Sequence, residues 1–288
     1  MTSATSNIGT QGLRPLTSLE RGYCRRSSMC FEVNMPKEDY ERFLKERMFK
    51  QEARRKDADQ RKTYDEVFDH RTLKLVYKFM IDGTFDTLDF PISTGKEGNV
   101  FRATDGDGLF LAVKIFRTSN STFKNIQRYI GGDPRFKGYE KNRRKLLSAW
   151  AQKEYRNLVR MHKTGASVPR PVEQRENIIV MEFLGSEGLP FPLLKDVEVD
   201  DYQKCLDLIV KDIRLIHDEA GLVHGDLSEY NIMYSDTHHI IDVGQGMLVT
   251  HPGAGELKTR DRDNLMRYFI KKGVNIDSIQ LHERMYGT

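Results

Sequence analysis

The pattern of apolar and polar positions divides the chain into a strand-rich part and a helix-rich part. Apolar residues recur at helical spacing over 63–81, and Gly83 is placed to end that helix. Short apolar or β-branched runs follow at 90–93, 99–104 and 109–116, with glycine-rich turns between them. Runs of this kind predict three antiparallel strands.

A second set of predicted elements follows the strands. Apolar residues at helical spacing predict a helix over 142–162, and the run 178–181 predicts a further strand before a loop at 185–192. From residue 201 the pattern is mainly helical, with two short strands and C-terminal helices. The chain is therefore predicted to be an α+β protein of two lobes, and the crevice between such lobes is the expected ligand site.

Composition agrees with this plan and narrows the class of protein. The chain has 288 residues, which suits two modest lobes, and 46 Lys and Arg against 42 Asp and Glu give a net charge of +4. A total this small does not argue for nucleic-acid binding, which needs a clustered basic face. No apolar run approaches the roughly 18 residues of a membrane span, and the polar start lacks the apolar region of a secretory signal. We therefore expect no membrane association.

The cysteines indicate a reducing compartment. Cys24, Cys30 and Cys205 are odd in number and fit no metal or redox spacing. Reduced thiols in a cytoplasmic protein are the simplest interpretation.

Two segments precede the first predicted strand. Residues 1–35 mix Ser, Thr, Gly and Arg without an apolar period and are predicted to form a disordered arm. About two thirds of the residues in 37–62 are charged, with both signs interspersed. This pattern is typical of a solvated helix, and a surface for a partner or RNA is the alternative.

The segment 223–231 and the turn after the next strand carry the clearest chemistry. Phosphoryl transfer from ATP needs a carboxylate that orients and deprotonates the acceptor hydroxyl, and an amide oxygen with a second carboxylate that hold Mg²⁺. Asp226 and Asn231 have the D-x-x-x-x-N spacing of a kinase catalytic loop, and Asp242 stands in an Asp-x-Gly turn after an apolar strand. Asp226 is predicted to be the catalytic base, and Asn231 and Asp242 the Mg²⁺ ligands.

Each of these residues alone has a structural explanation, because Asp and Asn are common in turns and at strand ends. All three in this order, with an apolar strand between Asn231 and Asp242, favour the catalytic interpretation. His224 is predicted to be a packed, hydrogen-bonded support rather than a proton donor.

A glycine-containing loop between the first two predicted strands is a candidate for phosphate binding. Its residues are Ser93, Thr94, Gly95, Lys96, Glu97, Gly98, Asn99 and Val100. The glycines permit close approach of a phosphate to the backbone, and hydroxyl and ammonium donors surround them. The loop matches neither the Walker A pattern nor the three-glycine loop of ordinary kinases. A phosphate loop and a simple hairpin turn both fit this pattern.

The third predicted strand contains the run 112–115, Ala-Val-Lys-Ile, which matches the lysine element of kinases. Such a lysine contacts the α and β phosphates and needs a carboxylate from a helix to hold it. Glu154 lies on the helix face shared with Trp150, so it is predicted to project toward the strands and pair with Lys114. A surface ion pair of Glu154 with a neighbouring Lys or Arg is the alternative.

Four segments together resemble the RIO-type atypical protein kinases. They are the Ser-Thr-Gly-Lys-Glu run at 93–97, the long insert at 119–137, the Trp-Ala-Gln-Lys-Glu run at 150–154 and the His-Gly-Asp-Leu-Ser-Glu-Tyr-Asn run at 224–231. The chain is most similar to the first branch of that family in its archaeal form, over about residues 59–286. The resemblance implies a trimmed protein-kinase fold, with a small β-rich N-lobe, a mainly helical C-lobe and no long activation segment.

The sequence patterns and the resemblance together imply a division into domains. The disordered arm at 1–35 is followed by a helical extension at 36–83, an N-lobe at 84–184 that includes a flexible insert at 119–137, and a C-lobe at 185–288.

The resemblance also implies the cofactors and the activity. ATP would bind with Mg²⁺, with Mn²⁺ as an alternative ion, for a serine/threonine kinase or ATPase role in maturation of the small ribosomal subunit. Lys114 and Glu154 would orient the nucleotide. The remaining nucleotide-binding candidates are Ser93, Thr94, Gly95, Lys96, Glu97, Gly98, Asn99, Val100, Ala112, Met181, Glu182 and Phe183. Met181 would lie behind the adenine, and the backbone of Glu182 and Phe183 would bind it.

Two kinds of phosphorylated residue are implied as well. Asp242 would form a transient phospho-aspartate, and Ser119, Ser121 and Thr122 in the insert are the autophosphorylation candidates.

The chain departs from ordinary protein kinases in three places. Gly225 replaces the Arg of the His-Arg-Asp motif, so no cation is present there to dock a phosphorylated activation loop. Neither an Ala-Pro-Glu element nor a long activation segment follows Asp242, and Ser228 stands where ordinary kinases have a Lys. These departures favour slow transfer to protein, or ATP hydrolysis coupled to a conformational change.

Three functions therefore compete. The first is a phosphotransferase acting on protein, itself included. The second is a small-molecule kinase of the aminoglycoside or choline type, against which the loop at 93–97 and the insert count. The third is an assembly factor whose ATP cycle gates release from the pre-small ribosomal subunit. The basic stretch 135–145 is a candidate for contact with rRNA phosphates, and a solvated basic face is its simpler explanation.

Overall fold

The computed structural model describes residues 67–95, 98–118, 126 and 142–287, all within one compact unit, Tyr40–Thr288. The predicted arm at 1–35 and the charged segment at 37–62 lie outside the described residues. Lys96, Glu97, Ser119, Ser121, Thr122 and nearly all of the insert lie outside them too.

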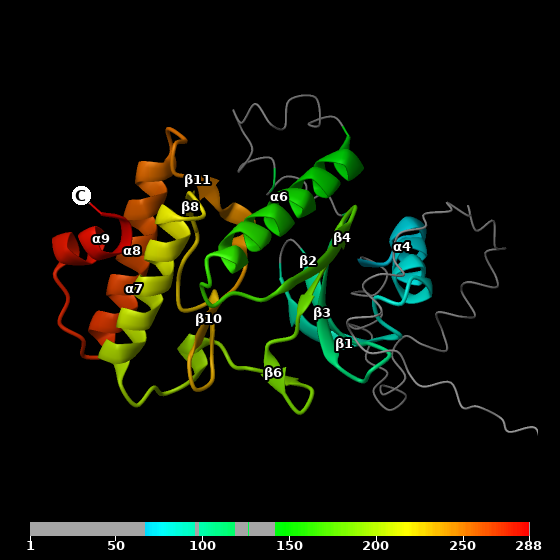
Figure 1. The fold of residues 1–288 in the computed structure, drawn as a ribbon, viewed down its shortest axis with the longest axis horizontal. Helices are drawn as coiled ribbons and strands as arrows, with labels where there is room; N and C mark the ends of the chain where they lie inside the picture. The colour runs from blue at the N-terminus through cyan, green and yellow to red at the C-terminus, as the bar shows by residue number, and fades with distance from the viewer. Residues whose placement is uncertain (1–66, 96–97, 119–125, 127–141, 288) are drawn as a thin grey trace, which may run out of the picture. The chain divides into compact units, whose positions relative to one another are not determined.

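A five-stranded antiparallel sheet forms the N-terminal lobe, in the order β1-β2-β3-β5-β4 (Figure 1). The strands are β1 (Thr87–Thr94), β2 (Gly98–Thr104), β3 (Phe110–Phe116), β4 (Pro171–Arg175) and β5 (Ile178–Glu182). Strand β3 pairs with β5 without a register shift, so that Lys114 lies opposite Ile179 and Ala112 opposite Met181. The central strand therefore carries the predicted lysine element.

Strand β4 is an addition to the strands that the sequence predicts. Pro171 begins it, and the register with β5 shifts between Pro171 and Glu173. Proline lacks an N–H and is tolerated at the first residue of an edge strand. Proline is typical of loops, but here Pro171 is the first residue of the edge strand.

One helix covers the sheet of the N-terminal lobe. Helix α4 (His70–Ile81) begins at Asp69, whose side chain accepts a hydrogen bond from the Thr72 N–H at 2.9 Å, and it is followed by Gly83 with φ of 72°. Its apolar face, which includes Val76 and Phe79, forms one core with buried residues of β1, β2, β3 and β5.

A second long helix, α6 (Arg143–Lys163), begins at the N-cap Asn142 and contacts strands β4 and β5. It also contacts the 3₁₀ turn η3 (Val243–Gln245) and helix α7 (Tyr202–Asp218). Leu146, Leu147 and Trp150 are buried on its inward face. Helix α6 thus joins the sheet to the turn that contains Asp242.

Helices dominate the C-terminal lobe, where α7 lies beside α8 (Ala254–Lys271) and α9 (Ser278–Tyr286) (Figure 1). Short strands β8 (Leu222–Val223), β9 (Ile232–Tyr234), β10 (His238–Ile240) and β11 (Met247–Leu248) form two small ladders, β9 with β10 and β8 with β11. A further hairpin joins β6 (Gly185–Ser186) to β7 (Leu189–Pro190), before the 3₁₀ turn η2 (Leu194–Asp196).

The two small ladders fix the loops that carry the predicted chemistry. Residues 224–231 run from the end of β8 to the beginning of β9, and Asp242 follows two residues after the end of β10. Residues 249–253 alone connect β11 to α8. No long activation segment is present in this fully described part of the chain, as predicted.

None of the helices in the described ranges combines the length and the apolar character that crossing a bilayer requires.

Candidate active site

A cavity of about 510 Å³ brings most of the predicted site residues together. A volume of this size is typical of a small-molecule site. The predicted residues that line it are Ser93, Gly95, Gly98, Val100, Ala112, Lys114, Glu154, Met181, Glu182, Asp226, Asn231 and Asp242. Residues separated by more than 100 positions in the sequence thus share one cavity, lined from both the sheet and the C-terminal lobe.

Three of the described residues that the sequence predicts for the site do not line this cavity: Thr94, Asn99 and Phe183. Asn99 is fully buried, and its Nδ2 donates to the Thr94 Oγ1 at 3.1 Å, so the pair ties the two ends of the loop together. Phe183 packs edge-on against Phe110 with ring centroids 5.7 Å apart. Each of these side chains thus contacts a neighbouring side chain rather than the cavity.

Gly98 is required by the sheet itself. It pairs with Phe116, and a Cβ added to it would lie 2.4 Å from the backbone oxygen of Ile115. A Cβ on Gly95 would lie 3.4 Å from the Gly98 oxygen, which is an ordinary contact. The close pairing of β2 with β3 therefore explains why residue 98 is a glycine. This explanation needs only a hairpin and no bound phosphate.

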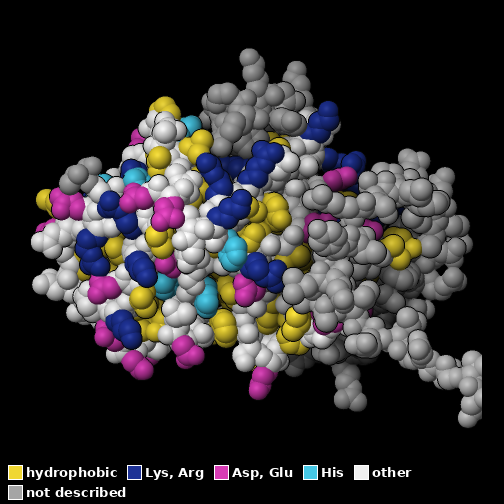
Figure 2. Space-filling view, viewed as in Figure 1, with side chains coloured by type: hydrophobic (Ala, Val, Ile, Leu, Met, Phe, Trp, Pro, Cys, Tyr) yellow, Lys and Arg dark blue, Asp and Glu magenta, His cyan; other side chains and the backbone are white. Residues whose placement is uncertain are grey.

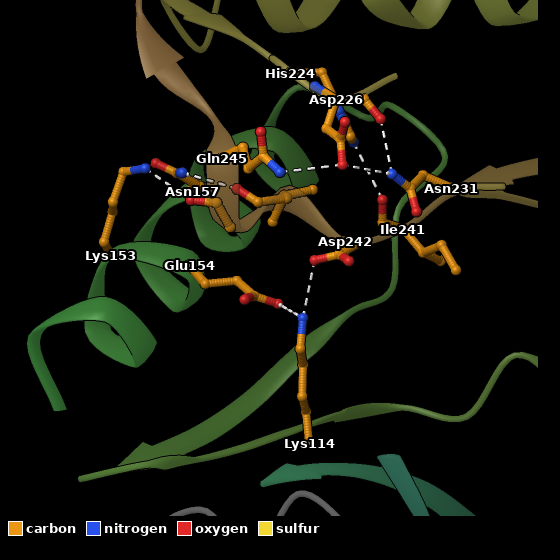
Figure 3. Close-up of polar contacts among 12 residues, drawn as sticks. Lys114, Lys153, Glu154, Asn157, His224, Asp226, Asn231, Ile241, Asp242 and Gln245 are labelled. Atoms are coloured by element: carbon orange, nitrogen blue, oxygen red, sulfur yellow. Dashed lines mark hydrogen bonds and ion pairs between the residues drawn. The ribbon is translucent and has the colours of Figure 1, made fainter. Parts of the chain in front are cut away.

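The charged centre of the site is Lys114 with two carboxylates (Figure 3). Its Nζ lies 2.7 Å from Glu154 Oε1 on α6 and 2.9 Å from Asp242 Oδ1, just before the 3₁₀ turn η3. Lys114 and Glu154 are nearly buried, whereas the Asp242 side chain is 51% exposed. The predicted pairing of Glu154 with Lys114 is present, and the surface alternative is not.

The three charges shift one another's protonation. Burial opposes the charge on Lys114, but Asp242 and Glu154 outweigh it and hold the pKa of Lys114 well above its ordinary value. The positive charge of Lys114 in turn lowers the pKa of Asp242 below its ordinary value. Lys114 is therefore a permanent cation and Asp242 a permanent carboxylate near neutral pH.

Asp226 is held by two side-chain amides. Asn231 Nδ2 lies 3.2 Å from Asp226 Oδ2 and 2.7 Å from the Asp226 backbone oxygen, and Gln245 Nε2 donates to the same Oδ2 at 3.1 Å. Arg260 Nη2 donates to Gln245 Oε1 at 3.1 Å, which orients that amide. Burial raises the pKa of Asp226 above its ordinary value, and the nearby Arg260 charge partly offsets this. A carboxylate with a raised pKa is a better proton acceptor than an ordinary one.

Two buried groups support the loop that carries Asp226. Asp261 on α8 is fully buried and accepts hydrogen bonds from the N–H of Gly225 at 2.7 Å and of Leu227 at 2.9 Å. His224 is 1% exposed, its Nε2 contacts the Ile241 oxygen at 3.1 Å, and its Nδ1 accepts from the Asp226 N–H at 3.3 Å. His224 is thus the packed, hydrogen-bonded support that the sequence predicts.

The turn after Asp242 is anchored to the underside of α6. Asn157 Nδ2 donates to the backbone oxygens of Val243 at 3.0 Å and Gly246 at 3.1 Å, and Lys153 Nζ donates to the Gly244 oxygen at 2.7 Å. Asp242 itself has φ of 59°, a left-handed conformation that Asp tolerates better than most residues. Helix α6 therefore fixes both the carboxylate partner of Lys114 and the turn that carries Asp242.

The donor set fits Mg²⁺ bound together with phosphates. Mg²⁺ in such sites is held by one or two carboxylates, and waters and phosphate oxygens complete its coordination. Asp242 supplies a carboxylate, and Asn231 donates through Nδ2 to Asp226, which leaves its Oδ1 as the atom suited to a metal. No cluster of three His, Cys, Asp or Glu suited to a metal exists in the described ranges. With one carboxylate and one amide oxygen from the protein, the donor set suits a metal that is bound together with the nucleotide phosphates.

Sequence reasoning does not identify Asp261, Gln245 or Asn157 as part of this site. A signal exists for two of them. Asp261 stands four residues before Leu265 on the apolar face of α8, where an acidic residue needs a buried partner, and Asn157 follows Glu154 by three positions on α6. Gln245 has no such signal, because its role depends on how the turn after Asp242 folds back toward Asp226.

Fold and site together define the class of protein: a phosphotransferase of the protein-kinase type, with a lysine on a central strand, a carboxylate from a helix and an Asp…Asn catalytic loop. A family model described as the RIO domain matches residues 99–283. The chain is 40% identical to the RIO-type serine/threonine-protein kinase Rio1 of Haloferax volcanii, over 81% of each chain. It is 35% identical to Rio1 of Methanocaldococcus jannaschii, over 89% of each. The chain belongs to the RIO family of protein kinases.

Two further comparisons set the extent of the similarity. The chain is 40% identical to RIO1 of Caenorhabditis elegans, but it spans 49% of that protein's length. The crystal structure of the Rio2 kinase–ADP/Mg²⁺–phosphoaspartate complex from Chaetomium thermophilum aligns with a TM-score of 0.56 and 22% identity, over 75% of this chain and 66% of that one. The predicted fold class and family are confirmed.

Proposed function

We propose that this chain transfers the γ-phosphoryl group of ATP to serine or threonine hydroxyls of protein, its own included, and that it also hydrolyses ATP. The observation that carries this proposal is the single cavity in which the Lys114–Glu154–Asp242 array faces the loop of Asp226 and Asn231. The curated relatives are named serine/threonine-protein kinases, which supports a protein acceptor over a small molecule.

Asp226 is the group that handles the proton. Two amides occupy its Oδ2, so Oδ1 is the atom that orients the acceptor hydroxyl and takes its proton. Lys114 binds the α and β phosphates and is held in place by Glu154. Asn231 and Asp242 would hold the metal, which would neutralise charge on the phosphate oxygens. Mn²⁺, with the same preference for oxygen ligands, is proposed as a substitute for Mg²⁺.

Asp242 is proposed as a second acceptor. Its side chain is half exposed to the cavity, and Lys114 keeps it ionised, so it has the properties of a nucleophile. One carboxylate oxygen would form a bond to the γ-phosphorus while the bond to the β–γ bridging oxygen breaks and ADP leaves. Water would then hydrolyse the acyl phosphate. The structure of the Chaetomium Rio2 kinase is described as a phosphoaspartate complex, which supports this route.

Incubation with γ-labelled ATP, followed by hydroxylamine treatment, tests both routes. Label on serine or threonine withstands hydroxylamine, whereas label on Asp242 is released by it. An Asp242→Asn variant loses the hydroxylamine-sensitive label in our account. Transfer of label to a small alcohol or sugar, with none to protein and none released as phosphate, would refute the proposed acceptors.

The proposed setting is maturation of the small ribosomal subunit, in the cytoplasm, with the precursor particle and its rRNA as partners. The chain is similar to Rio1 proteins, and the ribosomal role is what the resemblance to the RIO family implies. Cosedimentation with precursor particles in the presence of ATP analogues tests it. Migration apart from the particles in every nucleotide state would contradict it.

A further inference from the structure

Helix α6 concentrates the positive charge of the chain. It contains seven of the 46 Lys and Arg residues and one of the 42 Asp and Glu residues, so 39 basic and 41 acidic residues remain for all the rest. The single acid is Glu154, which is buried and paired with Lys114. The net charge of +4 therefore depends on this one helix.

Four of these basic residues form a stripe, which we call the α6 stripe: Lys145, Arg156, Arg160 and Lys163. At 100° per residue they lie within about 60° of one another around the helix axis, on the side opposite Glu154. All four side chains are exposed. The stripe is about 27 Å long, from 18 residues at 1.5 Å each. Figure 2 shows Lys and Arg side chains gathered along the path of α6 on this face.

Local stabilisation does not explain the stripe. Cations near the C-terminus of a helix interact favourably with its dipole, which accounts for Arg160 and Lys163. The same dipole disfavours Lys145, which stands in the first turn, and is neutral toward Arg156 in the middle. Among the described residues, none of the four side chains has a hydrogen bond or an ion pair, whereas Arg144 on another face of the helix pairs with Asp69 at 2.7 Å.

The surroundings of the stripe select the class of partner. Protein partners need apolar anchors at the centre of an interface. The large exposed apolar residues of the described chain are Ile81, Leu109, Leu189, Leu208, Tyr230, Ile270 and Ile279, and none of them is on α6. Membrane-surface helices also need an apolar face at the surface, and the apolar face of α6 is buried. Nucleic-acid interfaces are strongly basic and make most of their contacts to phosphates.

We propose that the α6 stripe is a docking surface for the phosphate backbone of RNA. This inference rests on the proposed rRNA partnership and adds the surface that makes the contact. Guanidinium groups bind phosphate oxygens in pairs, and two of the four residues are arginines one helical turn apart. RNA bound there contacts the outer face of the helix whose inner face holds Lys114 and the Asp242 turn.

The test compares two variants of equal charge in the full-length chain. The stripe variant carries Arg156→Gln, Arg160→Gln and Lys163→Gln. Its control carries Lys204→Gln, Lys211→Gln and Lys271→Gln, which are exposed lysines on α7 and α8. Both variants lose three positive charges, so an effect of net charge alone appears equally in both. ATP turnover of both variants stays at the wild-type rate, because neither alters a residue that lines the cavity.

Binding of an RNA duplex of about 20 base pairs is measured between about 50 and 200 mM salt. Each lost phosphate contact lowers the slope of log affinity against log salt by about 0.9. The slope of the stripe variant should be shallower than that of the wild-type chain by about 2 to 3. At about 0.1 M salt its affinity for the duplex should fall about 10²-fold, whereas the affinity of the control variant should fall less than about threefold.

Three outcomes would overturn the inference. Equal losses in both variants show that net charge alone is responsible. Unchanged RNA binding by the stripe variant places the contact elsewhere and leaves the ribosomal proposal standing, whereas no RNA binding by wild-type chain removes both. A stripe-dependent affinity for polyglutamate or phosphatidylserine vesicles above that for RNA assigns the surface to another partner.

Discussion

Asp261 is expected to be the strongest single support of the catalytic loop outside the cavity. Its two carboxylate oxygens accept the N–H groups of Gly225 and Leu227, which flank Asp226 on either side. Asp261, Gly225 and Leu227 are all buried, so bulk water does not reach the two N–H groups in place of the carboxylate. Asp261→Ala leaves two backbone donors without an acceptor.

The size of the effect follows from those two donors. An unsatisfied buried donor costs about 1–3 kcal/mol, which gives about 2–6 kcal/mol for the pair. Burial raises the pKa of Asp261, which means that the folded protein pays to keep it ionised, and the substitution relieves that cost. We therefore expect a loss near the lower end, about 2–4 kcal/mol, and a fall in Tm of about 5–15 °C.

Thermal unfolding and ATP turnover are the assays, with Asp263→Ala as the matched control. Asp263 lies one half-turn away on the same helix and, within the described part of the chain, pairs with its neighbour Arg262 at a partly exposed position. Its loss should therefore cost less than about 0.5 kcal/mol. In Asp261→Ala, kcat falls because Asp226 loses its fixed position, while the KM for ATP changes little. Asp261→Asn keeps one acceptor oxygen and should fall between the two.

A Tm for Asp261→Ala within about 2 °C of the Asp263→Ala value, with unchanged kcat, would contradict this role of Asp261. That result would mean that the loop holds its shape through other contacts.

Three further substitutions test other parts of the site. Glu154→Gln leaves Lys114 paired with Asp242 alone, so Lys114 competes with Mg²⁺ for the Asp242 carboxylate. In a metal titration we expect the Mg²⁺ concentration for half-maximal turnover to rise about 10–10² fold, which corresponds roughly to the free energy of one charged hydrogen bond. Arg260→Gln removes a charge that lowers the pKa of Asp226, so the acidic limb of the kcat/KM profile moves to higher pH; a shift to lower pH contradicts the assignment. Gly98→Ala drives a Cβ into a backbone oxygen and should lower Tm by several degrees in a melting experiment, whereas Gly95→Ala should not.

Much of the site could be predicted from local sequence, because its chemistry depends on short spacings. Asp226 and Asn231 are separated by five positions, and Glu154 shares a helix face with buried Trp150. The pairing of Lys114 with Glu154 needs only that the strand and the helix face each other, which the kinase plan supplies.

The residues that the sequence did not reveal depend on tertiary structure. Gln245 reaches Asp226 across a turn, and Asp261 reaches the catalytic loop from a helix 34 to 36 positions away in the sequence. Strand β4 is missed for a different reason. Proline weakens a strand prediction, yet it is tolerated at the first residue of an edge strand, which is where Pro171 stands.

The role of Asp226 is tested most directly by comparing nucleotide binding and phosphoryl transfer in Asp226→Ala with those of the wild-type chain. If Asp226 is the catalytic base, the rate of phosphoryl transfer to serine and threonine falls by about 10²–10⁴ fold. The affinity for ATP with Mg²⁺ stays within about threefold, since Lys114, Asn231 and Asp242 remain. Transfer to serine and threonine at the wild-type rate would contradict the assignment of Asp226.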